Sequence, residues 1–165
     1  MKKTLLVLIL FFCYISSVSA EIKRIISGNV DAKITIIAYE SLTCSYCANF
    51  HNDVYPQLKK EYIDTGLVKI EFRNFPLDIA ALNAAKIAQC NFDRSLEILG
   101  SLYSNQQSWV KGSSIEEINI SLKNFLEKEG FKVNFENCIN DKEIEDFILN
   151  DRIEGAKNFN VNATP

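Results

Sequence analysis

The segment from residue 33 to residue 73 constrains the fold most, because it places a strand, a helix and a second strand in succession. Residues 33–39 are β-branched and nearly all apolar, as expected for a strand that is covered on both faces. A helical pattern runs from Cys44 to about Tyr62, and residues 67–73 alternate like a strand. This order predicts a βαβ unit with a right-handed parallel crossover.

The expected helix contains Pro56, which removes one backbone hydrogen-bond donor. The apolar residues on either side of Pro56 keep their helical spacing. We therefore expect a bend near Asn52 and Asp53, and no clean break.

After residue 76 the pattern becomes helical. Asp78 can cap a helix that reaches Cys90, and residues 94–103 carry apolar side chains at helical spacing. Ser114 followed by Glu117 is a capping-box signature, and it opens a helix that ends near residue 130. A further helix is expected from about residue 141. The sequence thus predicts a helical block after the βαβ unit.

The first twenty residues have the three parts of a secretory signal. Lys2 and Lys3 precede an apolar run, which leads to small residues ending at Ala20. Cleavage after Ala20 is expected, and an uncleaved N-terminal anchor is the alternative. Removing 20 of the 165 residues leaves 145, enough for one domain, and the loss of two lysines changes the formal net charge from −3 to −5. Nothing basic in this composition suggests a nucleic-acid partner.

Four cysteines remain after cleavage: Cys44, Cys47, Cys90 and Cys138. In an oxidising compartment they allow three pairings, between which sequence alone does not decide. Cys90 and Cys138 both lie on helical segments of the same block, which suggests a structural disulfide between them. Two buried free thiols are the alternative.

Cys44-Ser45-Tyr46-Cys47 is the most informative motif. The strand delivers Cys44 to the first turn of a helix, where unpaired N–H groups and the helix dipole lower the pKa of a thiol. We therefore predict that Cys44 is a nucleophile, that Cys47 resolves its mixed disulfides, and that Ser45 and Tyr46 tune the thiolate.

Two other roles for this motif are weaker. A structural zinc site would need more ligands, but the chain has no second CxxC and its one histidine is His51, so we assign no metal. A purely structural disulfide between Cys44 and Cys47 would close a loop too small to stabilise much.

Several motifs in this order resemble the bacterial DsbA family: residues 36–51 around the CxxC motif, residues 72–78, residues 84–90, and residues 102–109 with Gln106 and Trp109. The likeness runs from about residue 27 to the last residue. It implies an α/β thioredoxin-like fold interrupted by a helical domain. It also implies a periplasmic dithiol oxidase that acts on unfolded or reduced exported proteins. A quinone-linked, DsbB-like membrane partner would reoxidise it, and no organic cofactor is implied beyond the redox-active disulfide.

The resemblance also implies a domain order and a C-terminal motif. Residues 21–77 would begin the thioredoxin-like domain, residues 78–155 would form the helical insertion, and residues 156–165 would return to the first domain. Thr164 and Pro165 would be the threonine and cis-proline that face the redox pair. The family continues with two strands and a helix that are absent here, so we expect a truncated, marginally stable and weakly active form. With nothing to lock its last proline, we expect that X-Pro bond to be trans.

Two neighbours of the motif have open roles. A buried acid that the family often carries would fall on Ala38, and Glu40 lies on the same strand face. Glu40 is then either a substitute proton relay or a solvated carboxylate at the strand end, and the second is favoured. His51 follows Cys47 by four residues, and we favour a polar residue near the helix surface over a modulator of the site. Trp109, with Gln106, is expected to pack within the helical domain, and contact with substrate is the alternative.

The direction of the chemistry stays open. A disulfide reductase or isomerase is one alternative, because redox poise depends on the stability of the Cys44 thiolate. A non-catalytic, peptide-binding protein with a truncated thioredoxin-like fold is the other.

Overall fold

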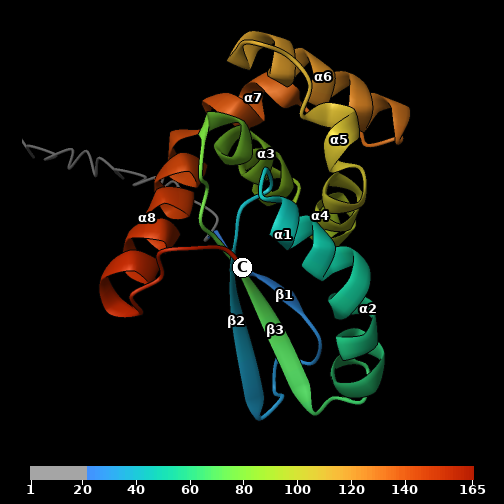
Figure 1. Cartoon of the computed structure of the whole chain (residues 1–165), viewed down its shortest axis with the longest axis vertical. Coiled ribbons are helices and arrows are strands. Elements are labelled where there is room, and N and C mark those ends of the chain that lie inside the picture. Colours follow the sequence, from blue (N-terminus) through green and yellow to red (C-terminus); the bar gives the residue numbers. More distant parts are fainter. Residues whose placement is uncertain (1–21) are drawn as a thin grey trace, which may run out of the picture.

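The computed structural model describes residues 22–165 (Figure 1). The expected secretion signal, residues 1–20, lies outside the described residues. Within the described part of the chain, every helix is too short or too polar to cross a bilayer.

A three-stranded sheet forms the base of the molecule. Its strands are β1 (Ile25–Ser27), β2 (Ile34–Glu40) and β3 (Val68–Asn74), in the order β1-β3-β2. β2 and β3 are parallel, and the helical segment between them makes the expected βαβ unit, with each strand starting one residue later than predicted. β1 pairs antiparallel with β3 and was not predicted, because three residues are too few to show a periodicity.

The turn after β1 depends on Gly28, which has a φ of 107°. A Cβ atom there would lie 2.7 Å from Cγ2 of Ile63 and 3.0 Å from the carbonyl oxygen of Val68. Both the backbone conformation and the space therefore call for glycine.

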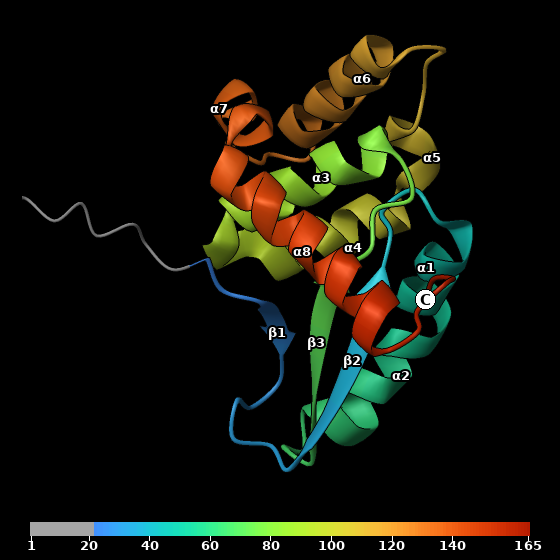
Figure 2. The ribbon, with the colours of Figure 1, turned by 90° about the vertical axis from the view of Figure 1, so that its left-hand side faces the viewer.

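Helices cover the two faces of the sheet unequally. Figures 1 and 2 show α8 along one face and the α1–α2 segment along the other. The inward residues of β3, Val68, Ile70 and Phe72, are buried. On β2, however, Ile34 is 58 % exposed and Ile37 is 39 % exposed, while the last three residues are buried. The expectation of a strand covered on both faces is therefore wrong for the first half of β2, which the helices do not reach.

The helix after the CxxC motif passes its proline without breaking, as expected. It consists of α1 (Ser45–Asn49), a π-helical turn (Phe50–Val54), α2 (Tyr55–Leu58) and a second π-helical turn (Lys59–Ile63). The N–H of Tyr55 donates to the carbonyl oxygen of Phe50, five residues back. This wider turn lets the helix accommodate Pro56, which has no N–H to donate.

The helical block follows the sheet. Its elements are α3 (Ile79–Cys90), a 3₁₀ turn (Phe92–Arg94), α4 (Ser95–Ser104), α5 (Gln106–Trp109), α6 (Ile115–Lys128), α7 (Phe135–Asn140) and α8 (Lys142–Asn158). Asp78 and Ser114 cap α3 and α6 as predicted, through bonds from the backbone N–H of Ala81 (2.7 Å) and of Glu117 (3.3 Å). The bounds of α7 were not predicted, although Cys138 was expected on a helical segment, because six residues are too few to show a helical period. Trp109 is fully buried, and its indole N–H donates to a carbonyl oxygen of the block.

Buried hydrogen bonds and ion pairs join α8 to the sheet. Asp151, 2 % exposed, accepts from the backbone N–H and the side-chain amide of Asn74, both at 3.2 Å, and pairs with Arg24. Glu154 accepts from Arg73 at 2.9 Å. The expected domain boundary at residue 155 falls inside α8, which contacts both α3 and β3. This helix therefore joins the block to the sheet.

Candidate active site

The end of β2 delivers Cys44 to the start of α1. Cys44 is the N-cap residue, with an extended backbone, and its carbonyl oxygen accepts from the N–H of Ala48 at 3.1 Å. Both Cys44 and Cys47 are free thiols, so the structure shows the reduced pair. Cys44 is 9 % exposed and Cys47 is fully buried. Attack from solvent is therefore directed to Cys44.

The helical block holds the loop that carries Cys44. The side-chain amide of Gln106 donates to the carbonyl oxygens of Leu42 at 2.8 Å and of Cys44 at 3.0 Å. The hydroxyl of Thr43 donates to the carboxylate of Asp78 at 2.7 Å. Sequence patterns placed Gln106 only in the packing of the block, because its partners lie more than sixty residues away.

The two thiols have opposite electrostatics. Burial opposes ionisation of Cys44, but contacts with Thr164, with Cys47 and with the N–H of Tyr46 outweigh it, so the pKa of Cys44 is lowered. Burial raises the pKa of Cys47 to about 12. The arrangement favours a thiolate on Cys44 and a protonated thiol on Cys47.

The C-terminal segment returns to this pair. The thiol of Cys44 donates to the carbonyl oxygen of Thr164 at 3.5 Å. The side-chain hydroxyl of Thr164 is buried and has no hydrogen-bond partner within the described chain. The Thr164–Pro165 bond is cis, so the expectation of a trans bond is wrong. That expectation assumed that nothing holds the last proline. In the structure the segment is held by the contact of Thr164 with Cys44 and by the bond from the N–H of Val161 to the carbonyl oxygen of Gly155 at 3.0 Å.

Glu40 and His51 form a buried pair. His51 Nε2 and Glu40 Oε2 are 2.8 Å apart, and the two side chains are 4 % and 3 % exposed. The favoured expectations of a solvated carboxylate and of a surface histidine are both wrong, because Glu40 at the end of β2 meets His51 of the π-helical turn in the interior. Glu40 Oε1 has no hydrogen-bond partner among residues 22–165, and the residue Glu40 lines a cavity of about 20 Å³, which has room for one water molecule.

Tyr103 completes this cluster, and sequence reasoning took it only for a core residue. Its ring stacks on His51 at 4.0 Å with an interplanar angle of 17°. Burial, and then the negative charge of Glu40, raise the pKa of Tyr103 well above its usual value. Helical periodicity marks Tyr103 as inward-facing, but it does not say that the inward neighbour is polar.

Ser45 and Tyr46 lie at the exposed edge of the motif, and Tyr46 is 72 % exposed. Their tuning of the thiolate stays a prediction. Within residues 22–165 no cluster of three or more His, Cys, Asp or Glu side chains is arranged to hold a metal ion.

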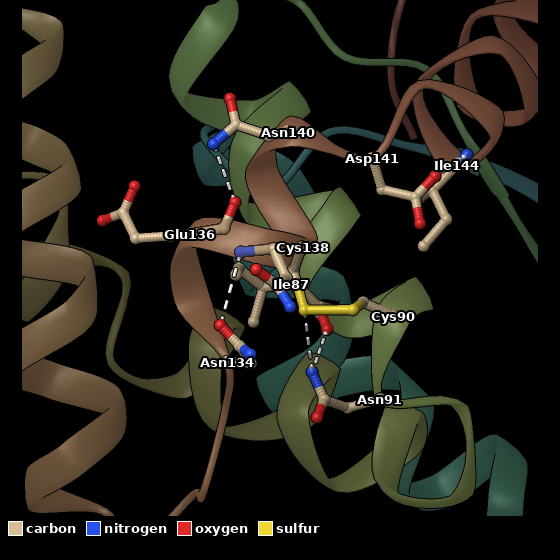
Figure 3. The surroundings of a disulfide bond; sticks show 10 residues. Ile87, Cys90, Asn91, Asn134, Glu136, Cys138, Asn140, Asp141 and Ile144 are labelled. Carbon is tan, nitrogen blue, oxygen red and sulfur yellow. Dashed lines mark hydrogen bonds between the residues drawn. A yellow bond between two sulfur atoms is a disulfide. The ribbon is translucent and has the colours of Figure 1, made fainter.

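The other two cysteines form a disulfide in the helical block (Figure 3). Cys90 ends α3, Cys138 lies in α7, and their Cα atoms are 5.6 Å apart. The amide of Asn91 donates to the carbonyl oxygen of Ile87 at 2.8 Å and lies 3.8 Å from the sulfur of Cys138. Of the three possible pairings, the structure thus has the one that leaves Cys44 and Cys47 together.

Known proteins resemble this chain over most of its length. A curated relative from Rickettsia bellii, named for protein-disulfide oxidoreductase activity, is 29% identical over 126 residues, which are 74% of this chain and 47% of the relative. The chain therefore spans about half the length of that relative. Disulfide bond formation protein D of Bacillus subtilis is 27% identical over 121 residues, 63% of this chain and 54% of that protein.

A solved structure agrees with the described fold. The crystal structure of alpha-DsbA1 from Wolbachia pipientis superposes with a TM-score of 0.77 and 33% sequence identity, covering 86% of this chain and 72% of that one. The family model described as thioredoxin matches residues 20–165. The chain therefore belongs to the thioredoxin family, as a DsbA-like member of it.

Proposed function

We propose that this protein is a thiol–disulfide oxidoreductase that oxidises dithiols in exported proteins through Cys44 and Cys47. One observation carries the proposal: Cys44 caps the start of α1 and its pKa is lowered, while Cys47 is fully buried and its pKa is raised to about 12. A stabilised Cys44 thiolate stabilises the reduced pair, and this makes the disulfide form an oxidant.

The reaction begins from the disulfide form. A substrate thiolate attacks Sγ of Cys44, the Cys44–Cys47 bond breaks, and Cys47 leaves and takes up a proton. A second substrate thiolate attacks the substrate sulfur of the mixed disulfide and releases Cys44 as its thiolate. The substrate dithiol becomes a disulfide, and its two electrons remain on the protein as the reduced pair. A quinone-linked, DsbB-like membrane partner then accepts these two electrons and restores the Cys44–Cys47 disulfide.

The asymmetry between the thiols also limits a side reaction. If Cys47 attacked the mixed disulfide, the substrate would be released unoxidised. At neutral pH a thiol with a pKa of about 12 is almost entirely protonated, so this attack is slow. The good leaving group, Cys44, lies on the productive route, which favours oxidation over reduction. In the reductive direction Cys47 is the resolving cysteine.

Thr164 and Pro165 belong to the substrate side of this proposal. The contact between Cys44 and the carbonyl oxygen of Thr164 places backbone groups beside the nucleophile. An extended peptide can use such groups for strand-like hydrogen bonds, which would align its cysteine with Cys44. The periplasm is the proposed location, with unfolded exported proteins as substrates.

Glu40 is proposed to exchange protons with Cys47. The charges of Glu40, Cys47 and Cys44 all raise the pKa of Tyr103, so these groups surround the same buried ring. The Glu40→Gln variant keeps the size of the side chain and a bond to His51. We expect it to exchange disulfides about a hundredfold more slowly at neutral pH, at the low end of the usual range for loss of a proton-transfer group, and with a changed pH profile. A merely structural role would leave the profile unchanged.

Two assays on the same preparation test the main proposal. Oxidative refolding of a reduced two-cysteine protein measures oxidation, and insulin precipitation measures reduction; Cys44→Ser is the control. We expect faster oxidation than reduction, and neither in the control. Faster reduction would favour a reductase or isomerase. Binding of reduced polypeptide without exchange in either assay would indicate a peptide-binding protein.

A further inference from the structure

A cleft beside Cys44 is separate from the Thr164–Pro165 segment. It has a volume of about 320 Å³, which is within the range of ligand clefts. One wall is the CxxC helix, and the other is the junction between α4 and α5; Figure 1 shows these elements side by side. Ser45, next to the nucleophile, lines the cleft, whereas Thr164 does not.

The wall on the CxxC helix is one continuous face. Its residues are Ser45 and the residues three, four and seven positions after it, which are Ala48, Asn49 and Asn52. Residues at this spacing lie along one side of a helix. Seven helical residues extend about 10 Å, which matches about three residues of an extended peptide. The hydroxyl of Ser104 donates to Asn52 at 2.9 Å and joins the two walls at the far end.

The lining is polar but uncharged. Ser45, Asn49, Asn52, Asn105, Gln106 and Gln107 supply amides and hydroxyls, and among the described residues no acidic or basic side chain borders the cleft. The side chains of Asn49 and Gln107 form no hydrogen bond within residues 22–165. Amide groups both donate and accept, so they match peptide groups and neutral polar side chains. An ionised side chain entering the cleft would lose water without gaining a counter-ion.

We infer that this cleft is a subsite for the substrate polypeptide, which takes about three uncharged polar residues beside the cysteine that attacks Cys44. The inference rests on the proposed function, and it adds a sequence preference to it. Gln106 links the two, because its side chain borders the cleft while its amide holds the carbonyl oxygen of Cys44. A peptide bound in the cleft therefore lies against the group that positions the nucleophile.

Three capped peptides test the inference. Each has a central cysteine, with flanks of serine and asparagine, of leucine and alanine, or of aspartate. The initial rate of reaction with the oxidised protein is followed by acid quenching and mass spectrometry. Dividing it by the rate of the same peptide with glutathione disulfide removes differences in thiol reactivity. We expect the normalised rate of the polar peptide to exceed the other two by about tenfold, which corresponds to roughly 1.4 kcal/mol.

The variant Asn49→Leu/Gln107→Leu should reduce this preference at least fivefold. Asn150→Leu is the matched control, since Asn150 is exposed on α8, away from the cleft, and should keep the preference. Asn49→Asp tests the same site by introducing a new preference. Its carboxylate should make the normalised rate of a lysine-flanked peptide higher than that of an aspartate-flanked one.

Equal normalised rates for the three peptides, or an unchanged preference in the Asn49→Leu/Gln107→Leu variant, would overturn the inference. The reaction of the oxidised parent with dithiothreitol separates this failure from failure of the proposed function. If dithiothreitol is oxidised without any peptide preference, only the subsite is wrong. If it is not oxidised, the proposed function fails as well.

Discussion

The protein has two cysteine pairs, a disulfide between Cys90 and Cys138 and the free thiols Cys44 and Cys47, and their surroundings differ. Cys90 is exposed and Cys138 is buried, and they join the end of α3 to α7 across a separation of 48 residues. Cys44 and Cys47 are both buried and lie one helical turn apart. Accessibility alone would therefore select the wrong pair as the redox centre. What marks Cys44 is stabilisation of its thiolate, by the helix start and by its contacts with Thr164 and Tyr46.

The largest expected difference between the pairs is in exchange activity. Cys44→Ser should reduce the rate of oxidative refolding at least about a thousandfold, because it removes the nucleophile and leaves no covalent route. Cys90→Ala/Cys138→Ala should remain within a few-fold of the parent. A comparable loss in both variants would show that the second pair takes part in the chemistry.

The reduced pair should be labelled in a strict order. Because the pKa of Cys44 is lowered from 9.0, its thiolate is present below the ordinary pH for a thiol, whereas Cys47 ionises only as the pH approaches 12. The difference of at least three units predicts a labelling ratio of about a thousandfold or more at mildly acidic pH. Iodoacetamide labelling over a pH series, read by peptide mass mapping, measures it. Equal labelling of both thiols would contradict the assignment of Cys44 as the nucleophile and Cys47 as its protonated partner.

The second pair should act on stability. In the chain-entropy model, a disulfide across 48 residues contributes about 4 kcal/mol to the free energy of unfolding. Cys90→Ala/Cys138→Ala should therefore lower the denaturation midpoint markedly, as measured in urea. Reducing the Cys44–Cys47 disulfide of the parent should not produce a loss of this kind, because so short a loop constrains the unfolded chain little.

A substitution at Gly155 in α8 tests whether the packing of α8 on the sheet holds the segment that ends at Thr164. A Cβ atom there would lie 2.7 Å from the ring of the buried residue Tyr39, and the carbonyl oxygen of Gly155 holds Val161. Gly155→Ala should lower the free energy of unfolding by about 1–3 kcal/mol through overpacking. It should also shift the pH profile of Cys44 labelling, since the segment that ends at Thr164 would move. Unchanged labelling would show that the segment is held independently of α8.

The smallest expected effects are those of removing the N-caps of α3 and α6. Asp78→Ala and Ser114→Ala each remove an N-cap, and each should cost about 1 kcal/mol in thermal or urea unfolding. Only Asp78 also accepts from Thr43, next to Cys44. Asp78→Ala alone should therefore change the labelling rate of Cys44, with Ser114→Ala as its control. An equal effect of both variants on Cys44 would mean that overall stability, and not this contact, governs the thiol.

The sequence by itself determined the local features of this protein. The βαβ order, the caps at Asp78 and Ser114, the tolerated Pro56 and the position of Cys44 at a helix start all follow from patterns a few residues long. Such patterns are visible because the interactions behind them join near neighbours in the chain. β1 was not predicted, and α7 had no predicted bounds, because each is too short to repeat its period.

Only the tertiary structure decided which distant groups meet. It buried Glu40 against His51 and Tyr103, and it placed Gln106 on the carbonyl oxygen of Cys44. The disulfide between Cys90 and Cys138 and the contact of Thr164 with the thiol had been suggested by the sequence, but alternatives to the disulfide were open until the structure was known. Glu40 at a strand end looked solvated, since alternation along β2 gives the face of a side chain and not what covers that face. The cover comes from packing of a helix against the sheet, and this depends on side chains far apart in the chain.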